Sequence, residues 1–476
     1  MTVDRRFVVK GLTDAEQGWL DALWSTLLDR QPNNLLRTGY YDFKHVASTA
    51  STLIAPQYRR AAAVLGWNSK AVDMLNRRTN LERFYWPDGD LESLGYTELV
   101  ESNNLFAELK GGRVSSLIHG VSFVLNTVGR PSVGEPESLI HVKDALNAAG
   151  WWNSRRRRLD ALLSVTAWND ESPSRPDGFV LYFDGITVTA DRTRGPRWEI
   201  DRQSHSFGVP AEPLVYRPRT GREFGSSRIT PPQMDLQDRA VRAVLRMEGH
   251  MDVYSVPQMW LLGGDESLFK NADGTQKAAW QLALGRMFGV PDDPDRQDSN
   301  ARAEVKQFPA QTPEPHMAQL SVLAKLFARE AYLPDSALAI TDMANPTSAD
   351  AYVAANDDLI AEAEGATEDW SLPMRRAVLR GLAIQNNDPG LLESARTLNA
   401  EWRSPIHVSR AAAADAGTKQ LSTVEWLKET EVGLELMGLS PEQAQRALAE
   451  RDRAQRRATL QSLLSGPGVT PDAVGG

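Results

Sequence analysis

Residues 224–348 constrain the fold more than any other stretch, because two long helical segments there flank an excursion rich in loop residues. The first segment opens at Thr230-Pro231-Pro232, where proline is tolerated because the N–H groups of a first helical turn have no intrahelical partner. The second opens near Thr312-Pro313-Glu314 and stops before Leu333-Pro334. We expect two antiparallel helices joined at one end by a small projecting module. This arrangement is unusual for a metabolic enzyme and typical of a subunit that spans the wall of a ring.

The excursion between the two helices combines a short strand with turn and loop signals. Pro257 excludes a simple continuation of the first helix, and the apolar run 258–262 ends at two glycines. Gly, Asp, Asn and Pro dominate residues 263–309, apart from a helix-like piece over 275–288. After the second helix and a loop, Ser348 opens a third helix. A separate helix is expected over 372–385.

The N-terminal half predicts a mixed α+β architecture. A leading helix has a cap pattern at Thr13, carries two tryptophans in an apolar stripe, and is expected to end at Pro32. A helix over 70–81 carries the pair Arg77-Arg78, which we expect to face solvent. Short apolar or alternating runs between 121 and 216 predict strands that pair with one another rather than βαβ units.

Two further patterns refine this picture. Gly111-Gly112-Arg113 is expected to precede a helix over 114–119, and a helical stretch over 58–67 is expected upstream. Near the end of the chain, Ser440 is expected to cap a last helix that runs to Leu464.

Charge and composition exclude several classes of protein. Lys and Arg number 53 against 62 Asp and Glu, which gives a net charge of −9, the wrong sign for a protein that grips DNA through its phosphates. The chain has no cysteine, which excludes disulfides and thiolate chemistry and suits assembly in a reducing cytoplasm. We expect no signal peptide and no membrane span, because no apolar run is long enough.

The sequence carries no recognisable catalytic or metal-binding constellation. It lacks a Walker A loop, a GxGxxG turn and a GxSxG elbow, and its seven histidines have no ligand spacing. The run Arg155 to Arg158 could form a patch for an anionic partner, but we favour a solvated surface because charge runs recur on ordinary surfaces. We therefore expect no enzymatic activity, no cofactor and no bound metal.

Five short segments together resemble portal proteins of tailed bacteriophages, the head-to-tail connectors, in the branch found in siphophages of actinobacteria. The resemblance covers about residues 34–464, and its specificity lies in the order and spacing of the segments rather than in one invariant motif. The segments are Gly221 to Thr230, Tyr254 to Gln258, Asn345 to Ala351, Leu427 to Glu429 and Met437 to Gln443.

The resemblance implies a helix-rich α+β portal fold that assembles as a ring of twelve subunits at one capsid vertex. DNA would enter through its channel during packaging and leave during ejection. The implied partners are further copies of the chain, double-stranded DNA passing without sequence preference, the terminase large subunit, major capsid and scaffolding proteins, and head–tail adaptors, with no membrane. The implied regions are the wing (1–230), first stem helix (231–252), clip (253–309), second stem helix (310–331), tunnel loop (332–347), long wing helix with its following helices (348–410), and crown with a flexible tail (411–476).

The same resemblance suggests which residues approach DNA. The tunnel loop would be the narrowest point of the channel, with Leu333, Pro334, Asp335, Thr341, Asp342 and Asn345. Arg242, Arg246, Lys325 and Arg329 on the stem helices are candidates for transient phosphate contacts. Salt bridges within a helix or between subunits are at least an equal alternative for these four cations, because the inner face cannot be deduced from the sequence.

Two other classes of protein compete with this hypothesis. A minor capsid or head–tail adaptor protein without a channel role would be structural too, but adaptors are usually much shorter. A nuclease or terminase subunit would need clustered carboxylates or a nucleotide-binding loop. The assembly state separates the three classes, since only the portal hypothesis predicts a large ring.

Overall fold

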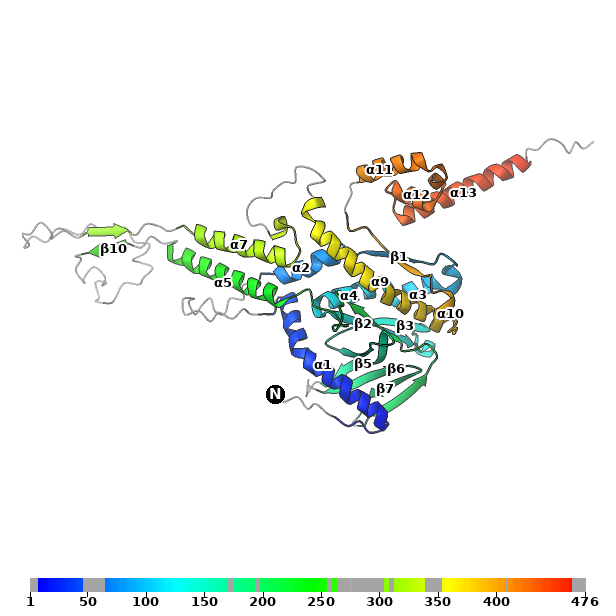
Figure 1. Ribbon diagram of the computed structural model, residues 1–476, viewed down its shortest axis with the longest axis horizontal. Helices are drawn as coiled ribbons and strands as arrows, with labels where there is room; N and C mark the ends of the chain where they lie inside the picture. The colour runs from blue at the N-terminus through cyan, green and yellow to red at the C-terminus, as the bar shows by residue number, and fades with distance from the viewer. Residues whose placement is uncertain are drawn as a thin grey trace, which may run out of the picture. The chain divides into compact units, whose positions relative to one another are not determined.

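The computed structural model describes residues 7–45, 65–169, 175–192, 195, 197–254, 259–262, 275, 304–307, 312–338, 353–406 and 410–464. It divides into two compact units, Met1–Pro405 and Ile406–Gly476. Both helices and sheets contribute, as Figure 1 shows, and the predicted helix-rich α+β class is confirmed. The expected helices over 58–64 and 276–288 lie outside the described residues.

A five-stranded antiparallel sheet in the order β4-β5-β6-β7-β8 forms one layer of the larger unit. Helix α1 (Asp14–Tyr41) packs on it with buried leucines and the buried Trp24, so this tryptophan of the apolar stripe lies in the core. The expected strands over 121–216 are all present, and every pairing among them is antiparallel. The bounds are β4 (Ala148–Asn153), β5 (Arg158–Trp168), β6 (Pro176–Phe183), β7 (Ile186–Asp191) and β8 (Glu199–Ser204).

A second antiparallel sheet, in the order β3-β2-β9, is covered by two helices on one face and contributes to a core with the five-stranded sheet on the other. Helices α4 and α9 both pack against it (Figure 1), and their contacts form the main hydrophobic core. The glycines expected before a helix lie inside α4, so that expectation was wrong. A Cβ at Gly112 would stand 3.0–3.1 Å from Leu214 and Val142, so glycine allows the close approach of helix and sheet. The bounds are β2 (Val121–Val128), β3 (Ser138–Asp144), β9 (Ala211–Val215), α3 (Tyr96–Asn103), α4 (Leu105–His119), and the short 3-10 turns Glu92–Leu94 and Pro131–Val133.

Helix α1 begins at the predicted residue but continues beyond its predicted end. Thr13 and Glu16 form the expected capping box, with each side chain bonded to the other's backbone. Pro32 lies inside the helix rather than at its end, so the predicted break is wrong. A proline inside a helix costs about 3 kcal/mol. Beyond Pro32, the buried Asn34 donates to the Ala145 carbonyl at 3.1 Å and Tyr40 enters the core, which offsets that cost.

The long helix α9 (Asp357–Gln385) is also continuous where two helices were expected. Pro373 lies within it, between Trp370 and Met374, both fully buried. Burying two such side chains contributes about 3–6 kcal/mol, enough to outweigh one interior proline. Past α10 (Leu391–Ser394), strand β12 (Asn399–Trp402) pairs antiparallel with β1 (Leu81–Tyr85), a long-range contact that no local pattern predicts.

Helix α2 (Trp67–Asn76) is shorter than expected, and its following arginine pair does not simply face solvent. Arg78 is buried and donates to the Pro405 carbonyl at 2.6 Å and to Asn356 Oδ1 at 3.0 Å. The expectation of a solvated pair is therefore wrong for Arg78. This side chain instead connects the start of the chain with its last third.

Helices α5 (Pro231–Tyr254) and α7 (Glu314–Glu330) lie side by side, as predicted (Figure 1). The residues described between them include strands β10 (Met259–Leu262) and β11 (Glu304–Gln307), which pair antiparallel. The 3-10 turn Asp335–Leu338 follows α7.

The smaller unit is helical. Ser440 accepts from the Gln443 amide at 3.3 Å while the Gln443 side chain accepts from the Ser440 amide at 3.1 Å, which confirms the predicted cap. A Cβ at Gly417 would stand 2.2 Å from the Leu436 carbonyl oxygen, so glycine lets two of the helices touch. The elements are α11 (Arg410–Thr423), the 3-10 turn Glu425–Glu429, α12 (Glu431–Leu436) and α13 (Pro441–Leu464). No helix among the described residues is long and apolar enough to cross a membrane.

Candidate functional site

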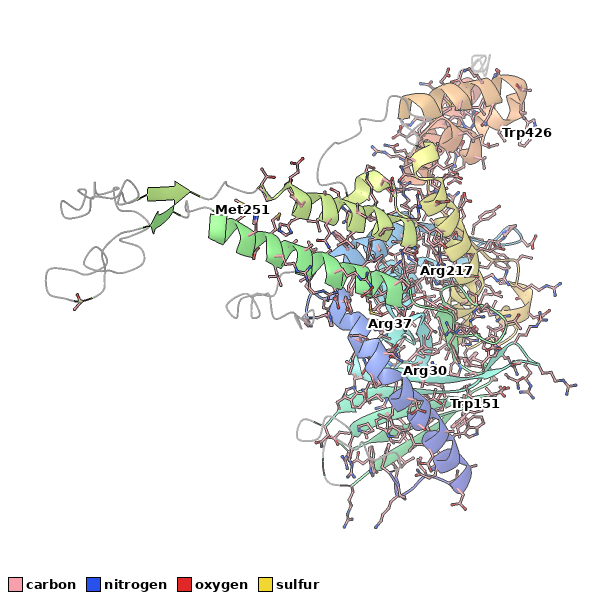
Figure 2. All side chains as sticks on the ribbon, turned by 60° about the vertical axis from the view of Figure 1, so that its left-hand side comes forward. Arg30, Arg37, Trp151, Arg217, Met251 and Trp426 are labelled. Atoms are coloured by element: carbon pink, nitrogen blue, oxygen red, sulfur yellow. The ribbon has the colours of Figure 1, made fainter. Side chains whose placement is uncertain are left out.

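The α5–α7 pair is the most distinctive feature of the larger unit. The two helices are antiparallel, because Gln233 near the start of α5 donates to the Glu330 carbonyl at 3.0 Å, while the rings of His250 and His316 lie at the other end with their centroids 5.3 Å apart. In Figure 2 the labelled Met251 lies at this other end of α5. Apolar side chains from α5 and α7 lie in the core, including Ala240, Ala243, Leu323, Ala324 and Phe327.

The four predicted phosphate-contacting cations occupy different environments on this pair. Arg246, Lys325 and Arg329 are exposed, and in the described part of the chain they make no ion pair. Arg242 is half-buried and lies near Tyr40, whose pKa is raised by burial and is lowered only in part by the Arg242 charge. Three of the four are therefore open to an anionic partner, whereas Arg242 is turned toward the body of the unit.

Two apolar side chains accompany the exposed cations of α7. Val322 is 57% exposed and Leu326 is 46% exposed, and they stand four residues apart on one face of the helix. The opposite face, with Leu320, Leu323 and Phe327, is buried. Helix α7 thus presents a mixed face of apolar and basic groups beside its packed face.

The α5–α7 pair is attached to the body through the fully buried guanidinium of Arg228, which precedes α5. Its Nε donates to the Ala71 carbonyl of α2 at 2.7 Å, and its Nη2 donates to the Ala331 carbonyl, at the C-terminus of α7, also at 2.7 Å. Its Nη1 donates to the Tyr216 hydroxyl at 3.1 Å. A cation at a helix C-terminus is favourable, because the last carbonyls have no intrahelical partner. We call this set of contacts the Arg228 junction.

A second group of charges continues the junction onto α9. The Tyr216 hydroxyl donates to Glu362, and Arg217 donates to the same carboxylate, with Nε 2.7 Å from Oε1. Burial alone would raise the pKa of Glu362, but the hydrogen bonds from Arg217 and Tyr216 outweigh it and lower that pKa. Burial raises the pKa of Tyr216 to about 12. Arg217 also stacks over the Tyr332 ring, 4.9 Å from its centroid, just beyond α7.

A third contact fixes the start of α5. Gln237 Oε1 accepts from both the backbone amide and the side-chain amide of Asn68 in α2, at 2.9 and 2.8 Å, and all these groups are buried. Together with the Arg228 junction, this bond ties both ends of the α5–α7 pair nearest the body to α2. The orientation of the pair is thereby set by buried polar contacts rather than by apolar packing alone.

The predicted tunnel-loop residues are only partly described. Leu333 and Pro334 are buried and belong to the compact end of α7, where the Leu333 amide donates to the Ala328 carbonyl at 2.8 Å. Asp335 is exposed. Lys70 donates to the Ala337 carbonyl, which fixes the turn that follows. The remaining three residues of this prediction, Thr341, Asp342 and Asn345, lie outside the described residues.

Sequence reasoning missed the members of the Arg228 junction as functional residues. The sequence analysis included Arg228 only as part of the portal-like segment Gly221 to Thr230, because the burial of an arginine has no local sequence pattern. Among the described residues, no three His, Asp or Glu side chains gather closely enough to hold a metal ion. The run Arg155 to Arg158 lies at the turn between β4 and β5, exposed as expected, with Arg156 and Arg158 paired to Asp160 and Asp184.

The fold and the α5–α7 pair agree with a known class of viral structural protein. The family model described as phage portal protein, SPP1 Gp6-like, matches residues 24–457, and the chain belongs to this family. This confirms the resemblance inferred from the sequence.

Two portal proteins and two solved structures are similar to this chain over most of its length. The chain is 26% identical to the portal protein of Mycobacterium phage D29 over 449 residues, covering 92% of this chain and 87% of the relative. It is also 26% identical to the portal protein of Mycobacterium phage L5, over an alignment that covers 80% of this chain and 77% of the relative. Among solved structures, the neck of a native GTA particle computed with C12 symmetry aligns with 87% of this chain and 99% of its own, at 13% identity and a TM-score of 0.41. The neck of an empty GTA particle computed with C6 symmetry aligns with 83% of this chain and 96% of its own, at 14% identity and a TM-score of 0.44.

Proposed function

We propose that this phage portal protein forms a dodecameric ring at one capsid vertex and serves as the channel for DNA packaging and ejection. The observation that carries the proposal is the antiparallel α5–α7 pair, fixed to the body by the Arg228 junction. Head-to-tail contacts between identical subunits close into a ring when the rotation between them closes, and such contacts need two different flanks on one subunit. A rigid helix pair held at a defined angle gives each subunit a wall segment of constant geometry.

The regions expected from the sequence become proposals about this architecture. Residues 1–230 and 348–410 would form the wing, 231–252 and 310–331 the stem, 253–309 the clip, 332–347 the tunnel loop, and 411–476 the crown and tail. The ring would be a virion component assembled in the host cytoplasm, would carry no catalytic activity, and would bind the terminase large subunit first and head–tail adaptors later. Capsid and scaffolding proteins would surround it.

Arg246, Lys325 and Arg329 are the cations best placed for transient contact with DNA phosphates, since they are exposed and carry no ion pair among the described residues. The buried Leu333 and Pro334 would shape the tunnel loop from within, while Asp335, Thr341, Asp342 and Asn345 would present polar or acidic groups to DNA. A protein of net charge −9 would hold DNA weakly, which suits a channel through which DNA slides.

The channel role is tested by reversing charge on α7. Particles assembled with Lys325→Glu and Arg329→Glu subunits should contain less packaged DNA than wild-type particles, at equal incorporation of the subunit. Arg239→Glu is the matched control, because Arg239 lies on α5 and is already paired with Asp235 at 2.8 Å. Normal DNA content in the α7 variant would favour the alternative, a minor capsid or head–tail adaptor protein without a channel role.

A further inference from the structure

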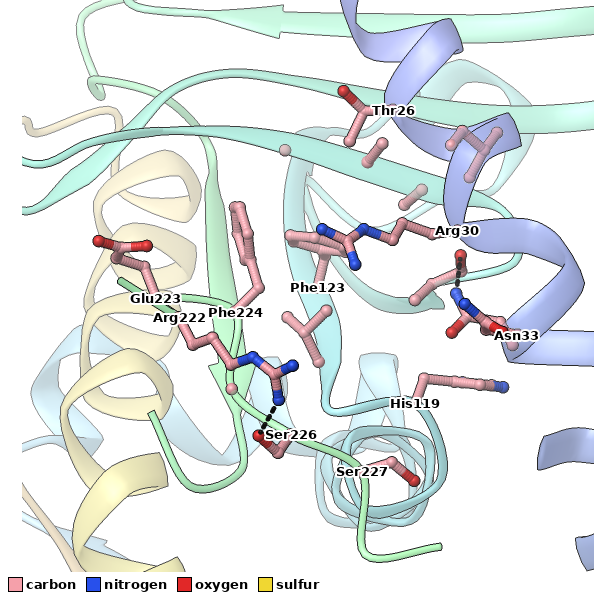
Figure 3. Close-up of a pocket in the computed structure, with 18 of the residues that line it drawn as sticks. Thr26, Arg30, Asn33, His119, Phe123, Arg222, Glu223, Phe224, Ser226 and Ser227 are labelled. Carbon is pink, nitrogen blue, oxygen red and sulfur yellow. Dashed lines mark hydrogen bonds between the residues drawn. The ribbon is translucent and has the colours of Figure 1, made fainter. Parts of the chain in front are cut away.

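A partly enclosed cavity of about 280 Å³ opens between α1, the end of α4, strands β2 and β4, and the loop that leads from β9 to Arg228. One side of it is apolar, formed by Val121, Phe123 and Phe224, and another is basic. Figure 3 shows Arg30 reaching into this space from α1 and Arg222 reaching into it from the loop. Nothing in the proposed channel function uses this cavity.

Three arginines line the cavity, and none of them has a carboxylate partner in the described part of the chain. Arg37 Nη1 donates to the His119 carbonyl at 3.4 Å, and Arg222 Nη1 donates to Ser226 Oγ at 3.3 Å. Arg30 and Arg222 are exposed and Arg37 is half-buried. Burial lowers the pKa of Arg37, and the neighbouring charges of Arg222 and Arg30 lower it further. The protein therefore keeps three mutually repelling cations around one cavity.

Among the described residues that line the cavity, no other group neutralises this charge. Glu223 lines its edge, but its carboxylate points away from Arg30 and Arg222 in Figure 3. Burial lowers the pKa of His119 to about 4, so its imidazole is neutral at pH 7. An uncompensated half-buried charge such as that of Arg37 is costly, and charges withdrawn from water in natural proteins are ordinarily compensated by a ligand or partner.

The number of cations and the size of the cavity select the ligand. A single carboxylate carries one negative charge and would leave most of the basic charge uncompensated, whereas a phosphate monoester carries close to two near neutral pH. Guanidinium groups match phosphate oxygens in bidentate geometry. A DNA duplex is too wide to enter a cavity of this size. We infer that the cavity binds a phosphate dianion, supplied either as inorganic phosphate or as the terminal phosphate monoester of a small molecule such as a mononucleotide.

Thermal unfolding and calorimetry of the full chain test this site without depending on ring formation. The probes are inorganic phosphate, adenosine monophosphate and adenosine, each compared with chloride at equal ionic strength, because phosphate also stabilises proteins by exclusion from their surfaces. The variants are Arg30→Met, Arg37→Met and Arg222→Met. The matched control is Arg219→Met, since Arg219 is exposed, lies three residues from Arg222 and does not line the cavity.

We expect phosphate to raise the unfolding midpoint of the wild type and of the control, and each cavity variant to weaken phosphate binding about tenfold or more. Without phosphate, Arg37→Met should unfold at the same or a higher temperature than the wild type, because it removes a half-buried repelling charge. Tighter binding of adenosine monophosphate than of phosphate would identify a small-molecule source, and equal binding would identify free phosphate. Equal responses of all variants and the control, no binding to the wild type, or binding of adenosine as tight as that of its monophosphate would overturn the inference.

Discussion

Replacing Arg228 with methionine tests whether the α5–α7 pair is held by the Arg228 junction. Methionine keeps an apolar stem in the pocket but removes the guanidinium donors to the Ala71 and Ala331 carbonyls. The loss of these buried charge-assisted hydrogen bonds costs ~1–3 kcal/mol each, and removing the desolvated guanidinium offsets part of the sum, so we expect a net loss of about 3 kcal/mol. Unfolding entropies of about 2.1 cal/mol/K per residue then predict a midpoint about 3–4 °C lower for the unit Met1–Pro405.

The assay for this prediction is thermal unfolding combined with amide hydrogen exchange. Exchange should accelerate over 328–333, the C-terminal end of α7, while the sheet β4–β8 keeps its protection. Arg219→Met serves as the control, since it is an exposed arginine and should change the midpoint by less than about 1 °C. If Arg228→Met unfolded at the same temperature as this control, with unchanged exchange at the end of α7, the junction would not hold the helix pair.

Three further predictions follow from burial, charge and the division of the chain. Leu333→Ala should lower the free energy of unfolding by ~2–5 kcal/mol because the side chain is buried, whereas the exposed Asp335→Ala should leave the unfolding midpoint unchanged. Only Asp335→Ala therefore tests a tunnel-loop role apart from stability. Equal unfolding midpoints of the two variants would contradict the burial of Leu333. Burial raises the pKa of Glu362, but the hydrogen bonds from Arg217 and Tyr216 lower it by more. The contribution of the ionised Glu362 to folding stability is therefore complete above its ordinary pKa of 4.5, and it is lost as the pH falls through the lower pKa of the folded state. The stability difference between wild type and Glu362→Gln should therefore shrink as the pH is lowered below 4.5 in denaturant titrations, and a constant difference would argue against this linkage. Truncation after Ile406 should leave the midpoint of the larger unit within about 1 °C of its value in the full chain, and a large drop in calorimetry would show that the two units do not fold independently.

Local rules predicted the features whose causes are local. The caps at Thr13 and Ser440 follow from side chains that satisfy nearby backbone amides, and both are present. The start and end of α7 were likewise predicted from its flanking prolines and apolar period. These signals act within a few residues, so one sequence suffices to read them.

Features decided by distant contacts were predicted less well. Pro32 was expected to end a helix, and a separate helix was expected over 372–385, but core packing on both sides of Pro32 and of Pro373 outweighs the local cost of each proline. The β1–β12 pairing joins segments more than three hundred residues apart, and the burial of Arg78 and Arg228 depends on carbonyls from remote elements. The sequence therefore predicted the candidate site as a helix pair with four candidate cations, but it did not predict the buried contacts that orient the pair.

The ring itself is the central claim, and electron microscopy of the purified full-length protein tests it most directly. Two-dimensional class averages should show closed rings of about a dozen subunits with a central hole, because matched flanks on identical subunits close by rotation. Monomers or dimers alone, at every salt and protein concentration and also in the presence of capsid and scaffolding proteins, would contradict the account.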